Sequence, residues 1–138
     1  AKPIFIRPVK QQRLPKYGIT YPTRCFPRIN GSFAQSVADY FGDNILYINV
    51  MNNLSIDCDC DSNPHDPEMK DIGILASTDP VALDQACLDL VYAVKPTEGN
   101  DNRPLVNRIE SLHGRHTVDY AETIGLGSKN YELVVLDT

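Results

Sequence analysis

The chain has 138 residues, of which 42% are hydrophobic, and a formal net charge of −5. This length and composition predict a single domain, residues 1–138, with one sizeable core. The acidic balance excludes nucleic acid as the main partner, because phosphate binding requires clustered Lys and Arg side chains. No apolar run approaches the ~20 residues that a membrane-spanning helix needs, so we expect no membrane partner.

The chain has four cysteines, but a core of this size does not depend on disulfides for stability. No charged and then apolar signal segment opens the sequence. We therefore expect a cytoplasmic protein with reduced thiols. The first residue is Ala1 rather than Met, which suits either a processed product or a portion of a longer protein.

The first 31 residues are predicted to form an extended, basic strap on the surface. A short strand is expected over residues 4–9, followed by loop. Prolines recur throughout residues 1–31, and Lys and Arg are interspersed among them, which indicates irregular structure rather than a nucleic-acid-binding stripe. The prolines are Pro3, Pro8, Pro15, Pro22 and Pro27.

Helices and strands alternate over the rest of the chain. A helix is expected to begin at Ser32, with apolar residues at helical spacing, and to stop at Gly42. Residues 44–50 have almost no polar face, so they are predicted to form a buried strand. Residues 72–76 are predicted to form a second short buried strand.

The clearest helix start in the sequence is Pro80, with Thr78 or Asp79 as the N-cap. Two shorter helices are expected after it. The first of them ends at Gly114, and the second begins with Thr117 as its cap.

A final strand is expected over residues 131–136. Strands interleaved with helices predict an α/β or α+β fold. We expect a mixed, mostly buried sheet of about four strands flanked by about four helices.

The run DCDCD, residues 57–61, places two thiols among three carboxylates. If the chain keeps one strand parity after residue 46, Cys58 and Cys60 share a side with the apolar residues and lie about 7 Å apart. A hairpin at residues 52–53 would instead mix core residues with aspartates on one face. We therefore expect both thiols on one side of an extended segment.

Two thiolates at this spacing are half of a tetrahedral zinc or iron site. Cys25 and His65 are the candidates for further ligands, since thiolate and imidazole together suit zinc or iron. The alternative is that Cys58 and Cys60 are small buried thiols that fill the inward face of a strand end. The flanking aspartates raise the pKa of both thiols, a repulsion that a bound cation offsets. Either zinc or an iron-sulfur cluster is the cofactor that this motif predicts.

A calcium or magnesium site is a further alternative, because hard oxygen ligands gather in the same region. The spacing lacks the glycine and the distant bidentate glutamate of an EF-hand loop, and an ordinary solvated acidic loop explains it as well. The carboxylates are those of Asp57, Asp59, Asp61, Asp66 and Glu68.

Other chemistry-bearing residues have structural interpretations. Cys87 falls on the apolar face of the helix that begins at Pro80, which indicates core packing. His113 and His116 flank a predicted turn between helices. Residues 125–128 contain two glycines but follow a helix rather than precede one, so they indicate a helix stop.

Residues 45–89 contain the motifs DCDCD and DIGILASTDPVALDQAC, and residues 108–134 contain HTVDYAETIGLGS. These motifs resemble the domain of unknown function 362 family, whose members are often labelled uncharacterised iron-sulfur centre proteins. The resemblance implies an iron-sulfur or redox association. The chain has no C-x2-C-x2-C-x3-C run, so a ferredoxin cluster is not carried over. It resembles the C-terminal portion of a longer member, and a ferredoxin-like domain of the same or another chain is the expected partner.

Three functional hypotheses follow from the sequence. The first is an accessory domain of an iron-sulfur or redox-associated protein, with Cys58 and Cys60 in a metal or cluster site. The second is a metal-free scaffold or protein-interaction domain. The third is a divalent-cation-dependent enzyme that uses the acidic loop.

Overall fold

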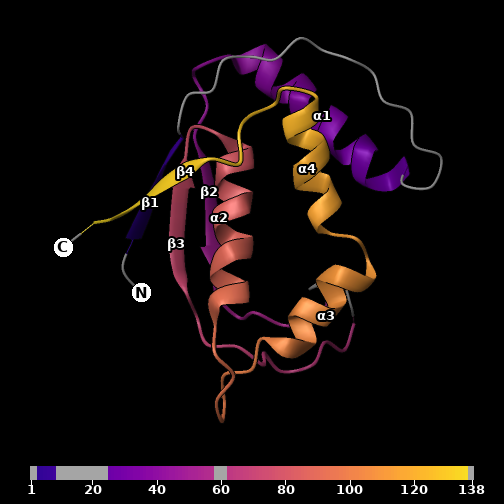
Figure 1. Cartoon of the computed structure of the whole chain (residues 1–138), viewed down its shortest axis with the longest axis vertical. Helices are drawn as coiled ribbons and strands as arrows, with labels where there is room; N and C mark the ends of the chain where they lie inside the picture. Colours follow the sequence, from indigo (N-terminus) through magenta and orange to yellow (C-terminus); the bar gives the residue numbers. More distant parts are fainter. Residues whose placement is uncertain (1–2, 9–24, 58–61, 137–138) are drawn as a thin grey trace.

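The computed structural model describes residues 3–8, 25–57 and 62–136, with the backbone alone for residue 3 and residues 25–30. Four strands form one sheet in the order β2-β3-β1-β4. β1 and β3 are parallel, whereas β4 is antiparallel to β1 and β2 is antiparallel to β3 (Figure 1). The strands are β1 (Pro3–Pro8), β2 (Tyr47–Met51), β3 (Gly73–Ser77) and β4 (Tyr131–Val135).

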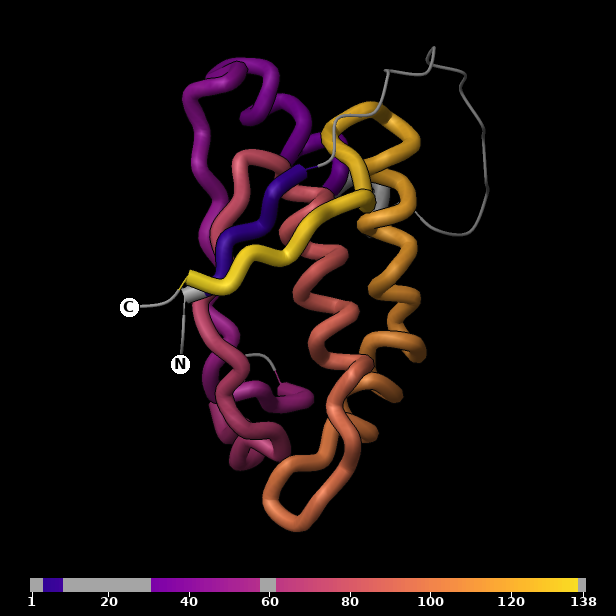
Figure 2. Tube along the Cα trace, turned by 60° about the vertical axis from the view of Figure 1, so that its left-hand side comes forward, coloured from indigo at the N-terminus to yellow at the C-terminus, as the bar shows by residue number. Residues whose placement is uncertain are grey.

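Four helices accompany this sheet in the described part of the chain. Helix α2 packs across one face of the sheet and contacts all four strands. Helix α4 packs on α2, and α1 packs on α4 (Figures 1 and 2). The predicted α/β fold, with a mixed four-stranded sheet, is confirmed. The helices are α1 (Cys25–Phe41), α2 (Pro80–Ala93), α3 (Arg103–Ser111) and α4 (Arg115–Thr123).

The main core lies between the sheet and α2. Ile6 of β1 and Leu75 of β3 are fully buried there, against Leu83 and Ala86 of the helix. Each buried aliphatic side chain of this size contributes roughly 1.5–3 kcal/mol through its removal from water. Because side chains alternate along a strand, the neighbours of Ile6 and Leu75 in sequence face the other side of the sheet.

The side of the sheet opposite α2 carries exposed aliphatic side chains. Ile48 and Val50 of β2 are 57% and 58% exposed, and Ile74 of β3 is 44% exposed. Val50 pairs with Ile74 in the register, so these side chains adjoin. The strand predicted to be buried over residues 44–50 is therefore an edge strand with one covered face. An apolar run alone does not tell whether both faces of a strand are covered.

Two helices begin at residues other than those predicted. Helix α1 begins at Cys25 rather than at Ser32, so residues 25–31 are helical although we expected them in the strap. Pro27 falls in the first turn, where its missing N–H has no intrahelical partner to lose. Helix α4 begins after Gly114, and Thr117 lies within the helix rather than at its cap. None of the described helices is long and apolar enough to cross a membrane.

The start of α2 agrees with the prediction. Asp79 is the N-cap, and its Oδ1 accepts hydrogen bonds from the backbone N–H groups of Val81 at 2.9 Å and Ala82 at 3.1 Å. Pro80 occupies the first turn, where its fixed φ suits a helix. The Asp79 carboxylate already satisfies these free N–H groups, so this helix terminus is structural.

Candidate functional site

The segment that links β2 to β3 carries the predicted metal-binding motif. Asn53 has a φ of +48°, so the chain turns directly after β2. Leu54 then packs against the core, whereas Val50 lies on the exposed face of the sheet. The prediction that Val50 and Leu54 share one face is therefore wrong, because the turn at Asn53 breaks the alternation, while Cys58 and Cys60 lie outside the described residues.

Three of the four predicted ligands are cysteines. Cys58 and Cys60 lie outside the described residues. Cys25 is described only as the first backbone residue of α1. Figures 1 and 2 show α1 at one end of the molecule and the segment 52–72 at the other. The structure therefore does not bring α1 to His65, the fourth predicted ligand.

His65 is bound to Asp57 through two hydrogen bonds. Oδ2 of Asp57 lies 2.6 Å from Nδ1 of His65 and accepts the backbone N–H of His65 at 3.0 Å. These bonds, the backbone one first, hold the pKa of Asp57 below its usual value, and Arg108 adds a weaker attraction. The imidazole itself is largely exposed.

Ser55 closes the base of the same loop. Its Oγ donates to the carbonyl oxygen of His65 and accepts the backbone N–H of Asp57, both at 3.2 Å. Ser55, Asp57 and His65 therefore hold together the two ends of the segment that contains Cys58 and Cys60. The carboxylate of Asp57 serves this closure.

The described residues do not form a complete metal centre by themselves. Across residues 3–8, 25–57 and 62–136, no three His, Cys, Asp or Glu side chains are grouped so that they could hold a metal ion. A metal centre at His65 would therefore include ligands from outside these described residues.

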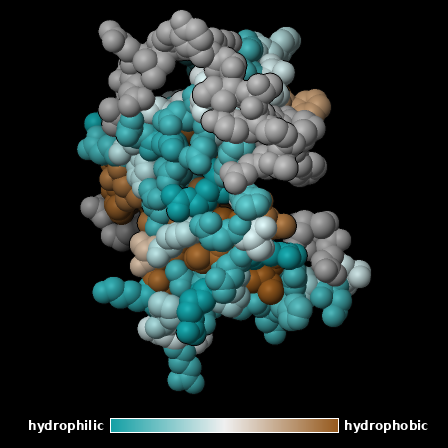
Figure 3. Space-filling view, turned by 45° about the vertical axis from the view of Figure 1, so that its right-hand side comes forward, coloured by the Kyte–Doolittle hydropathy of each residue, from teal (hydrophilic) through white to brown (hydrophobic). Residues whose placement is uncertain are grey.

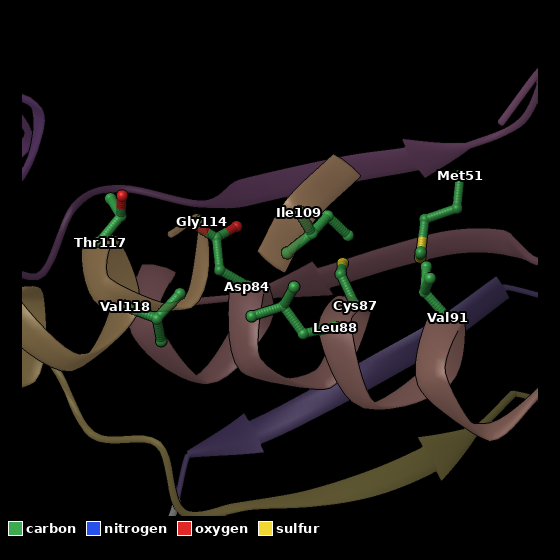
Figure 4. A pocket seen from close by; sticks show the side chains of 9 residues that line it. All are labelled: Met51, Asp84, Cys87, Leu88, Val91, Ile109, Gly114, Thr117 and Val118. Carbon is green, nitrogen blue, oxygen red and sulfur yellow. The ribbon is translucent and has the colours of Figure 1, made fainter. Parts of the chain in front are cut away.

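A separate pocket lies between α2 and the pair formed by α3 and α4 (Figure 4). Its volume is about 280 Å³. Apolar side chains also gather across the middle of the largely polar surface that carries α3 and α4 (Figure 3). One wall consists of α2 residues at helical spacing, which share one face of the helix: Asp84, Cys87, Leu88 and Val91. The other walls consist of Met51, Ile109, Gly114, Thr117 and Val118.

Asn49 of β2 connects two polar groups in this wall. Its Nδ2 donates to Oδ1 of Asp84 at 3.1 Å and to Sγ of Cys87 at 3.3 Å. Loss of hydration raises the pKa of the Asp84 carboxyl and of the Cys87 thiol, and the bond from Asn49 opposes each rise. Cys87 is therefore an uncharged thiol at neutral pH and a poor nucleophile.

No pattern in the sequence predicts this pocket as a whole. The i, i+3 spacing of Asp84 and Cys87 on a largely apolar helix was the available indication. Asn49 and Thr117 belong to no such pattern, because only long-range packing brings β2 and α4 to α2. His113 lies in the turn between α3 and α4 with a φ of +53°, and His116 lies at the start of α4.

The mixed sheet with α2 across one face defines a small α/β domain. The chain belongs to the family described as Domain of unknown function (DUF362), whose model matches residues 9–89. The matched region includes Asp57 and His65 in the loop as well as Asn49, Asp84 and Cys87 in the pocket. The family resemblance of the sequence is confirmed. No curated protein and no solved structure matches the chain significantly.

Proposed function

We propose that this chain is an accessory domain of an iron-sulfur or redox-associated protein, and that Cys58, Cys60 and His65 bind a metal ion or cluster. The observation that carries this proposal is the hydrogen bond between Nδ1 of His65 and the carboxylate of Asp57. Histidines that bind metals characteristically donate one ring N–H to a carboxylate, which fixes the tautomer and orients the other ring nitrogen. In His65 this arrangement makes Nε2 the nitrogen that carries the lone pair.

The closed base of the loop also supports the proposal. Asp57 and His65 restrain the ends of the segment that carries Cys58 and Cys60. A shorter effective loop lowers the entropy lost when its side chains converge on one ion. Two thiolates and an imidazole suit zinc or iron, and a positive ion offsets the repulsion between thiolates and the flanking aspartates. A ferredoxin-like partner domain completes the fourth position in this proposal.

Elemental analysis of protein purified without oxygen tests the proposal. We expect stoichiometric zinc or iron in the wild-type chain, and an ultraviolet-visible spectrum separates the two metals. The double substitution Cys58→Ser, Cys60→Ser removes the metal, and Asp57→Asn weakens binding by roughly 10–100-fold through the lost orienting carboxylate.

Cys87→Ser is the matched control, because Cys87 lies in the pocket wall and not in the loop. It should leave the metal content unchanged. Wild-type protein without metal, or an equal loss of metal from the control and the double variant, would contradict the metal site.

A metal-free interaction domain is the second candidate, and the exposed sheet face favours it. Ile48, Val50 and Ile74 form an adjoining aliphatic surface on two strands. Contiguous exposed apolar surface of this kind marks a contact with another protein. In the purified chain the available apolar partner is a second copy, whose sheet would stack face to face at about 10 Å.

Sedimentation velocity over a range of concentrations tests this second candidate. We expect wild-type protein to self-associate reversibly and the double substitution Ile48→Lys, Val50→Lys to stay monomeric. The control Asn107→Lys, Ser111→Lys adds the same charge at exposed positions of α3. A wild-type chain that stays monomeric at every concentration would exclude this role for the sheet face.

A further inference from the structure

The pocket between α2 and the α3–α4 pair is independent of the loop at His65. Its volume, about 280 Å³, lies near the lower end of the range of small-molecule sites, which begins at roughly 300 Å³. Its lining is mostly aliphatic, with Leu88 and Val91 on one wall and Ile109 and Val118 on the other (Figure 4). A pocket of this size and lining takes a small molecule with an apolar body.

The polar groups of the pocket determine what the rest of that molecule must supply. A side-chain amide has two N–H donors, and Asn49 uses one on Asp84 and the other on Cys87. The Asp84 carboxylate remains as a hydrogen-bond acceptor with negative charge. A ligand that contacts Asp84 in the α2 wall must therefore supply the hydrogen-bond donor itself.

The electrostatics of Asp84 favour a cation as that donor. Asp84 lines the pocket, and its carboxylate accepts a hydrogen bond from Asn49 at 3.1 Å. A positively charged group at this carboxylate forms a charge-assisted hydrogen bond. An anion would be repelled, and a purely apolar molecule would offer the carboxylate no partner beyond Asn49.

We propose that this pocket binds a small organic ammonium ion, with its apolar body between Leu88, Val91, Ile109 and Val118 and its ammonium group on Asp84. Cys87 forms part of the wall as an uncharged thiol, so binding is non-covalent. This site uses none of the residues of the proposed metal centre.

Three probes separate charge from shape: 2-phenylethylamine carries both features, 2-phenylethanol lacks the charge, and ethylamine lacks the ring. Binding is measured by chemical-shift changes of backbone amides in the isotope-labelled chain. We expect 2-phenylethylamine to shift amides of α2 and α4 and to bind about tenfold more tightly than either of the other probes.

Asp84→Asn should remove the tenfold preference for the amine over the alcohol, whereas Asp39→Asn, on the exposed surface of α1, should retain it. Cys87→Leu fills the pocket and should weaken all three probes, and Thr117→Leu does so from the α4 wall if the first variant does not fold. Equal binding of amine and alcohol to the wild-type chain, or no shifts at pocket residues with any probe, would overturn the proposal. None of these outcomes depends on metal content. The proposal for the pocket and the proposal for the metal centre can therefore each be contradicted without the other.

Discussion

Asp79 and Ser128 are joined by a hydrogen bond that ties the start of α2 to the loop after α4. Oδ2 of Asp79 accepts the backbone N–H of Ser128 at 2.9 Å, while Oδ1 caps the helix. Ser128 is buried, and Gly127 beside it has no room for a side chain, because a Cβ there would overlap the Asp79 carboxylate. One carboxylate therefore satisfies backbone donors from two elements that lie 49 residues apart.

Replacing Asp79 should therefore lower the free energy of unfolding. We expect Asp79→Ala to lower the free energy of unfolding by about 2–3 kcal/mol, the sum of a lost N-cap and a lost hydrogen bond to a charged group. Asp79→Asn should cost about half of that, because an amide oxygen still caps the helix. Urea denaturation measures both. Thr78→Ala, at the exposed neighbouring position, is the control, and an equal effect of the two alanines would contradict the assignment.

Gly127→Ala tests the same contact from the other side. The added Cβ must displace the Asp79 carboxylate, so we expect a loss of about 2 kcal/mol or more. Gly99→Ala is the comparison, since nothing surrounds that position and its φ of +71° costs only about 1–2 kcal/mol. A smaller effect at Gly127 than at Gly99 would show that the loop moves freely away from Asp79.

Adjacent residues of β3 should respond very differently to truncation. Leu75 is fully buried against α2, so Leu75→Ala should cost about 2–5 kcal/mol. Ile74 lies on the open face of the sheet, so Ile74→Ala should lower the free energy of unfolding by less than about 1 kcal/mol. Chemical denaturation of both variants measures this contrast. Similar losses would mean that the open face is covered in solution.

The bond between Asp57 and His65 predicts a pH dependence of stability. The pKa of Asp57 is lower in the folded chain than its ordinary value of 3.8. At pH values between the folded pKa of Asp57 and its ordinary value of 3.8, the unfolded chain binds more protons than the folded chain. Stability therefore rises with pH in this interval. The contribution is fully present above about pH 4 and is lost as the pH falls through the folded pKa.

Unfolding free energies of wild type and Asp57→Asn should therefore differ at about pH 6 and converge as the pH falls through the folded pKa of Asp57. Asp66→Asn alters an exposed carboxyl of the same loop and is the control. A difference between wild type and Asp57→Asn that does not change with pH would contradict an ionic role for Asp57.

Tyr131 predicts an effect of opposite sign in alkali. Burial and the hydrogen bond from its hydroxyl to Asp89 raise the pKa of Tyr131 from 10.0 to about 12. The Tyr131 hydroxyl therefore loses its proton at a lower pH in the unfolded chain than in the folded chain. Stability falls as the pH rises between these two pKa values. Tyr131→Phe should remove this part of the decline. Tyrosinate absorbance should show late ionisation of Tyr131 and Tyr92, whose pKa is also about 12, and loss of one of the two in the variant.

Local patterns in the sequence predicted much of this fold. The start of α2 follows from Asp79 and Pro80, whose side chains act within one helical turn. The order of the strands did not follow, because pairings such as Ile4 with Val135 depend on contacts between distant residues. The open face of β2 was missed for the same reason, since burial depends on what other elements cover.

The candidate site shows the same division between near and distant contacts. His65 is a candidate ligand on its neighbourhood in sequence, but its bond to Asp57 depends on a loop closure that no periodic pattern encodes. The bond from Asn49 to Asp84 spans 35 residues and joins a strand to a helix. Neither residue type in isolation indicates such a contact.

The position of β1 in the interior of the sheet has a consequence for synthesis of the chain. β1 is translated before both of its neighbours, since Ile4 pairs with Leu75 on one side and with Val135 on the other. Pairings this distant are slow to form, because a long stretch of chain must be ordered first. While the polypeptide emerges from the ribosome, the aliphatic side chains of β1 therefore stay exposed to solvent for longer than those of the other strands. They are the stretch on which a nascent-chain chaperone would act.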